Sequence, residues 1–138
     1  MDSNLYQSQK AMEHGRLALQ KGGIMILLAS CWDGIGDRVF YDMLCDFKEG
    51  DDIARYTGDN YKLGNHKAVR MLSLAEYAKI WAVTGLEQDI LTPARITRKE
   101  CLQDAVDEAC QIIKDAGGKP NIIVLPSGSL IVPRLSNG

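Results

Sequence analysis

The sequence has no long hydrophobic run and no large excess of charge of either sign. Its longest uninterrupted apolar stretch runs from Ile24 to Ala29, far short of the roughly 20 residues that a membrane-spanning helix needs and too short for a signal-peptide core. The 16 basic and 18 acidic residues give a net charge of -2, so charge provides no reason to expect binding to nucleic acid or to an anionic membrane. We therefore expect a cytoplasmic protein with neither partner.

The sequence also lacks a pattern that binds metal. Its 4 cysteines form no C-x-x-C pair, and its 2 histidines, His14 and His66, are far apart in the chain. Cysteines in a chain without a secretory signal are best interpreted as reduced thiols. We expect no metal site built by this chain alone.

What the chain does contain is an alternation of helical and strand patterns, over a length of 138 residues that suits one domain, residues 1–138. Helical spacing of apolar residues and capping signals predict the main helices. These are Leu5 to Lys21 capped by Asn4 or Ser3, a helix capped by Asp37 with Val39 and Phe40 inward, Tyr61 to Tyr77, and a helix after a capping box at Thr97 to Glu100.

Short apolar runs bounded by turn residues predict strands at Ile24 to Ala29, Lys79 to Thr84, Ala94 to Ile96 and Asn121 to Leu125. Strands joined through helices need crossover connections, which favours a parallel sheet. The predicted fold is a three-layer α/β domain, Rossmann-like, with a mainly parallel sheet of about four strands flanked by helices.

In such sheets, ligands gather beyond the carboxyl ends of the strands. The loop Ser30 to Asp37 follows the first strand there, and Gly34 and Gly36 would let a ligand approach the backbone closely. Asp33 places negative charge where an anion would bind, so the alternative is a simple turn followed by an Asp37 helix cap. Trp32 could line a pocket or belong to the core.

The predicted first helix carries a second candidate site. Tyr6 and Gln7 precede Lys10 by four and three positions, so a phenol, an amide and an ammonium share one side of the helix. The ammonium could pair with a carboxylate and the amide could bond a hydroxyl. Spacing alone leaves a solvated polar face as the alternative.

Four segments stand out together along the chain: Asn4 to Ala11, Ser30 to Gly36, Leu63-Gly64-Asn65-His66-Lys67-Ala68, and Leu125 to Ser129 followed by Pro133. Together they resemble the C-terminal domain of the nickel-dependent lactate racemase family. Their order and spacing extend over nearly the whole chain.

The resemblance implies a two-domain racemase or epimerase of 2-hydroxy acids that works by hydride transfer. Its nickel-pincer nucleotide would be held by a separate N-terminal domain, in the same or another chain, which this sequence lacks. Tyr6, Gln7 and Lys10 would face the substrate, and no catalytic residue would lie in this chain. We expect an excised domain or one half of a split enzyme, inactive alone. The alternatives are a non-catalytic α/β domain that binds a small anion or nucleotide at Asp33, Gly34 and Gly36, and a scaffold whose partner domain performs all the chemistry.

Overall fold

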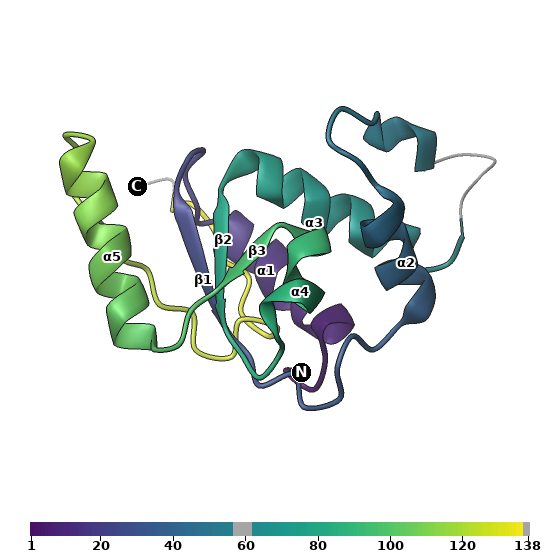
Figure 1. The fold of residues 1–138 in the computed structure, drawn as a ribbon. Coiled ribbons are helices and arrows are strands. Elements are labelled where there is room, and N and C mark those ends of the chain that lie inside the picture. Colours follow the sequence, from purple (N-terminus) through teal and green to yellow (C-terminus); the bar gives the residue numbers. More distant parts are fainter. Residues whose placement is uncertain (57–61, 137–138) are drawn as a thin grey trace.

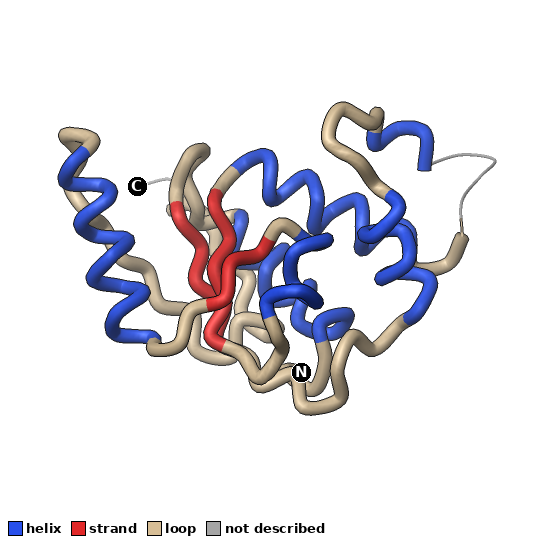
Figure 2. Tube along the Cα trace, in the orientation of Figure 1, coloured by secondary structure: helices blue, strands red, loops and turns tan. Residues whose placement is uncertain are grey.

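The central sheet is parallel, as predicted. The structure, a computed structural model, describes residues 1–56 and 62–136. Within these ranges the sheet has three strands in the order β1-β2-β3, which lie side by side at the centre of the molecule (Figures 1 and 2). They are β1 (Ile24–Leu28), β2 (Lys79–Val83) and β3 (Ile96–Arg98). Both strand pairs are parallel, with Ile24 opposite Lys79 and Ile80 opposite Ile96.

Helices cover the two faces of the sheet, which confirms the predicted three layers. Alternate residues of a strand point to opposite faces. Ile80 and Ala82 lie in the larger core, whereas Trp81 packs in a smaller core with Ala105 and Ala109 of helix α5. The larger core is covered by α1 (Leu5–Arg16), α2 (Arg38–Asp46) and α3 (Asn65–Tyr77), and the smaller by α5 (Leu102–Asp115). The shorter helical elements are η1 (Ile53–Tyr56), α4 (Gln88–Leu91) and η3 (Thr92–Ala94).

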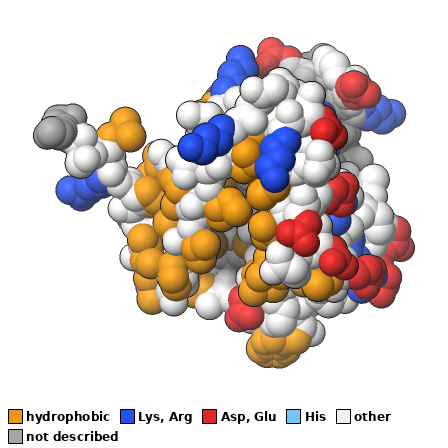
Figure 3. Space-filling view, turned by 90° about the vertical axis from the view of Figure 1, so that its left-hand side faces the viewer, with side chains coloured by type: hydrophobic (Ala, Val, Ile, Leu, Met, Phe, Trp, Pro, Cys, Tyr) orange, Lys and Arg blue, Asp and Glu red, His pale blue; other side chains and the backbone are white. Residues whose placement is uncertain are grey.

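The predicted fourth strand is wrong. Residues 121–125 lie after α5 and carry no strand assignment, and Ile122 and Val124 are 58% and 75% exposed. A run of β-branched residues favours an extended backbone, but a strand also needs a neighbouring strand to bond. Hydrophobic side chains gather on part of the α5 side of the molecule (Figure 3).

Two predicted helix boundaries also differ. The first helix ends at Arg16 rather than Lys21, because residues 17–19 donate to carbonyls three positions back and form turns. Helix α3 begins at Asn65 rather than Tyr61, which lies outside the described residues. Gly64 precedes it with φ +102°, a left-handed conformation that a helix cannot include.

Three further predictions, for β3, for the start of α5 and for the start of α2, differ from the structure in detail. Strand β3 spans Ile96–Arg98 instead of Ala94 to Ile96, so Thr97 belongs to the strand and does not open a capping box. Helix α5 instead begins after Cys101, which makes no side-chain cap. Val39 is 39% exposed, so its predicted inward position is wrong, whereas Phe40 is fully buried as expected.

Candidate functional site

The loop after β1 wraps around the start of α1. Within it, the carbonyls of Gly34 and Ile35 accept hydrogen bonds from the amides of Leu5 and Tyr6 at 3.0 and 3.1 Å. In the other direction, the amide of Asp33 donates to the carbonyl of Ser3 at 2.7 Å. The first amides of a helix otherwise lack partners within the helix. Here the chain itself binds them, so they are not free to bind an anion.

Asn4 connects this loop to the helix. It is the predicted N-cap of α1: its side-chain Oδ1 accepts from the amide of Gln7 at 2.9 Å, and its Nδ2 donates to the Asp33 carboxylate at 3.2 Å. Gly36 has φ +85°, and a Cβ there would lie 2.5 Å from Asn4 Oδ1. The close backbone approach that Gly36 permits is therefore made by a side chain of the same protein.

The other residues of the loop have separate roles. Gly34 adopts φ +72° in open space, so it is needed for the turn rather than for a close contact. Trp32 is 78% exposed, which excludes the core position. Asp37 caps α2 as predicted, accepting from the amide of Phe40 at 2.7 Å. Binding of a ligand at Asp33, Gly34 and Gly36 remains a prediction.

Tyr6, Gln7 and Lys10 all lie in α1, at the helical spacing that the sequence predicts. Tyr6 and Gln7 are half-buried and Lys10 is exposed. The Tyr6 ring packs edge-on against Phe40 of α2, with centroids 5.4 Å apart. The Tyr6 hydroxyl, the Gln7 amide group and the Lys10 ammonium have no hydrogen-bond or ion-pair partner among the described residues. All three polar groups are thus available to a ligand or to another domain.

Lys67 of α3 lies against this face, a contact that the sequence does not predict. Its Nζ donates to the carbonyl of Tyr6 at 3.1 Å and lies 3.8 Å from the centre of the Tyr6 ring. Burial lowers the pKa of Lys67, and the charges of Lys10 and Arg70 lower it further, whereas Glu13 opposes this effect. The signal available in the sequence was the Gly64-Asn65-His66-Lys67 segment, which gives no indication of the contact with Tyr6.

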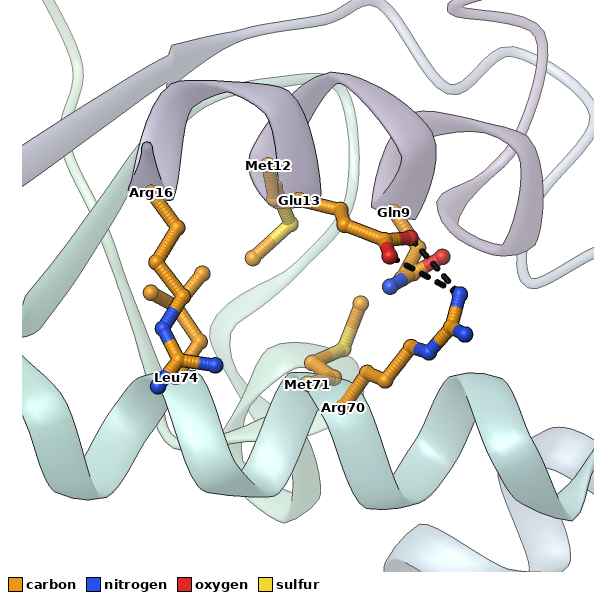
Figure 4. A pocket seen from close by; sticks show the side chains of 7 residues that line it. All are labelled: Gln9, Met12, Glu13, Arg16, Arg70, Met71 and Leu74. Carbon is orange, nitrogen blue, oxygen red and sulfur yellow. Dashed lines mark hydrogen bonds and ion pairs between the residues drawn. The ribbon is translucent and has the colours of Figure 1, made fainter. Parts of the chain in front are cut away.

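A small cavity of about 120 Å³ opens between α1 and α3 (Figure 4). Glu13 and Arg70 form an ion pair at 2.9 Å across it. Gln9, which is 3% exposed, also lines it and has no side-chain hydrogen bond to the described residues. The full lining is Gln9, Met12, Glu13, Arg16, Arg70, Met71 and Leu74. Lys10 is not part of it, so the cavity and the predicted substrate face are neighbouring but separate features.

The described residues include no group of three or more His, Cys, Asp or Glu side chains that could hold a metal ion. His14 instead ties the C-terminal segment to α1, with its Nδ1 2.9 Å from the carbonyl oxygen of Gly128. The described residues therefore offer no site that would hold a nickel ion by itself. No helix in the described ranges is long and apolar enough to cross a membrane.

Comparisons with known proteins agree with this architecture. The lactate racemase from Thermoanaerobacterium thermosaccharolyticum is 40% identical over 53 residues, which are 38% of this chain and 12% of that protein. The solved structure of the lactate racemase apoprotein from the same organism matches 96% of the chain with a TM-score of 0.80 and 29% identity. The chain spans only 33% of that solved chain. A family model described as lactate racemase C-terminal domain matches residues 1–132. The chain therefore belongs to the lactate racemase C-terminal domain family.

Proposed function

We propose that this chain is the substrate-facing C-terminal domain of a 2-hydroxy acid racemase or epimerase. The family match over residues 1–132 carries the proposal. The complete enzyme would be cytoplasmic and would also contain an N-terminal domain, in the same or a separate chain, that binds a nickel-pincer nucleotide. That group would supply reversible hydride acceptance at the substrate carbon. The residues of this chain would bind and orient the substrate.

The unpartnered polar groups of α1 support these roles. Lys10 would pair with the substrate carboxylate, and the Gln7 amide would hydrogen-bond a hydroxyl or carboxylate oxygen. Tyr6, fixed against Phe40, would present its hydroxyl beside them. Such contacts hold the substrate in one orientation and contribute through position and charge, not through proton transfer.

The proposal is tested with the enzyme assembled from this chain and the cofactor-carrying domain of its own organism. We expect D- and L-2-hydroxy acids, lactate among them, to interconvert on chiral chromatography, and the chain alone to be inactive. In D2O, hydride transfer retains the substrate's carbon-bound hydrogen, so the product should carry no deuterium at that carbon. Absence of racemisation across a panel of short 2-hydroxy acids, with the cofactor loaded, would refute the proposal.

Lys10→Ala tests the orienting role. Loss of one charged contact costs about 1.5–3 kcal/mol, which corresponds to a decrease in kcat/KM of roughly 10- to 150-fold. Lys114→Ala, a change at an exposed lysine of α5 on the opposite side of the sheet, is the matched control. Activity of the Lys10 variant within twofold of the control would assign the chemistry to the partner domain and make this domain a scaffold.

The regulatory-domain alternative receives no support from the loop geometry. A small anion at the loop would need free amides, and those of Leu5 and Tyr6 are bonded to Gly34 and Ile35. The Asp33 carboxylate at this point would repel an anion as well.

A further inference from the structure

Lys67 is a partly buried lysine without an acidic partner among the described residues. It reaches from the first turn of α3 to α1, where its ammonium contacts the carbonyl and the ring face of Tyr6 at 3.1 and 3.8 Å. Charged side chains that are withdrawn from water are usually paired. The absence of a carboxylate beside this ammonium therefore needs an explanation.

The two acidic side chains that act on Lys67 are already engaged. Glu13 is paired with Arg70 at 2.9 Å, and the Asp37 carboxylate caps α2 at 2.7 Å. Three basic groups surround the same place, since Lys10 and Arg70 both act on the charge of Lys67. The charges of Glu13 and Asp37 offset only two of these three cations, so a net positive charge remains and the local field favours an anion.

We propose that Lys67 is the second ammonium of a binding site for a small 2-hydroxy-carboxylate, which it forms together with Lys10 of α1. This inference rests on the proposed function and specifies which groups bind the substrate carboxylate. A lysine ammonium has three N–H donors, and the carbonyl of Tyr6 uses one of them. The ring of Tyr6 also faces the ammonium, so the donor of Lys67 that points away from Tyr6 would bind one carboxylate oxygen, while Lys10 would bind the other.

The contact with Tyr6 also places Lys67 in a defined position. A cation over an aromatic face is attracted to it, and the ring is itself held by Phe40. Lys67 is thus oriented before any ligand arrives, whereas Lys10 extends into water from the next turn of α1. A prepositioned donor loses less freedom on binding than a mobile one.

The experiment is an NMR titration of the 138-residue chain with sodium L-lactate and D-lactate, at an ionic strength held constant with NaCl. The side-chain signals of Lys67 and Lys10 are followed together. We expect both signals to move with one dissociation constant. Lys67→Gln should raise that constant about five- to tenfold, as expected for losing one partly screened charged contact, and Lys67→Arg should restore most of the affinity. Lys114→Gln is the control for an exposed charge.

A purely structural role of Lys67 predicts a different result. In that case Lys67→Gln lowers the melting temperature but leaves the dissociation constant of the folded protein unchanged. A Lys67→Gln constant within twofold of the wild type, with binding lost in Lys10→Gln, overturns the inference and leaves the proposed function intact. A wild-type Lys67 signal that does not move with lactate also overturns it, even if the Gln variant fails to fold. The proposed function is tested separately, by the racemisation assay on the assembled enzyme.

Discussion

Gly36→Ala should destabilise the chain more than Gly34→Ala, although both glycines lie in one loop with positive φ. An alanine in the left-handed region costs about 1–2 kcal/mol, and this cost applies at both positions because φ is +85° and +72°. At position 36 the new Cβ would also lie 2.5 Å from Asn4 Oδ1, whereas at position 34 nothing lies within 4 Å. The Asn4 side chain must then leave the amide of Gln7.

The expected losses of unfolding free energy depend on whether the Asn4 N-cap of α1 is lost. Loss of an N-cap costs about 0.5–2 kcal/mol, so Gly36→Ala should cost about 1.5–4 kcal/mol in total and Gly34→Ala about 1–2 kcal/mol. Urea unfolding followed by circular dichroism measures both free energies, with unchanged m-values as evidence that the unfolded states are comparable.

A double-mutant cycle with Asn4→Ala isolates the clash. Removing the Asn4 carboxamide removes both the cap and the atoms that the new Cβ would meet. In the Asn4→Ala background, Gly36→Ala should therefore cost only about as much as Gly34→Ala, a coupling of about 0.5–2 kcal/mol. Equal costs of Gly36→Ala in the two backgrounds would refute the assignment of Gly36 to the cap of α1.

Three further outcomes are expected. The pKa of Lys67 is lowered from 10.5, so the unfolded chain binds this proton more tightly and the contribution of Lys67 to stability rises as the pH approaches 10.5. Lys10→Gln should raise the pKa of Lys67. An NMR titration of Lys67 that is unchanged in this variant would contradict the proximity of the two charges. The Ser30 amide and hydroxyl lower the pKa of the Asp2 carboxyl below 3.8, so its contribution is present above pH 3.8 and lost as the pH falls through the lowered pKa; Ser30→Ala should return the pKa of Asp2 towards 3.8 by NMR. Asp37→Ala removes the cap of α2 and should cost about 0.5–2 kcal/mol in urea unfolding, with Asp42→Ala as an exposed control.

Local signals predicted much of the fold correctly. The apolar run at Ile24–Leu28 and the segment Lys79–Val83 form strands. Short apolar runs bounded by turn residues are typical of buried strands and are too short for most helices. Asn4 and Asp37 cap the helices that follow them, since a side-chain oxygen can satisfy the free amides of the first turn. These features depend on residues within a few positions of one another.

Features that depend on distant partners were not predicted. Residues 121–125 have the composition of a strand, but composition does not say whether an adjacent strand is available in the chain. The contact of Lys67 with Tyr6 joins residues 61 positions apart, and no pattern in either segment encodes it. The polar face of Tyr6, Gln7 and Lys10 was predicted because helical spacing is local, whereas its neighbour from α3 became evident only in the folded chain.

The loop and the polar face were interpreted as two separate candidate sites, and the structure joins them into one unit. A glycine that permits close approach does not reveal which atom approaches: for Gly36 it is Asn4 Oδ1. Through Asn4, and through the bonds of Gly34 and Ile35 to Leu5 and Tyr6, the loop after β1 fixes where the first turn of α1 begins. The positions of Tyr6 and Gln7 follow from that start. Under the proposed function, a change in the loop should therefore alter substrate binding through the helix, even where the loop itself touches no ligand.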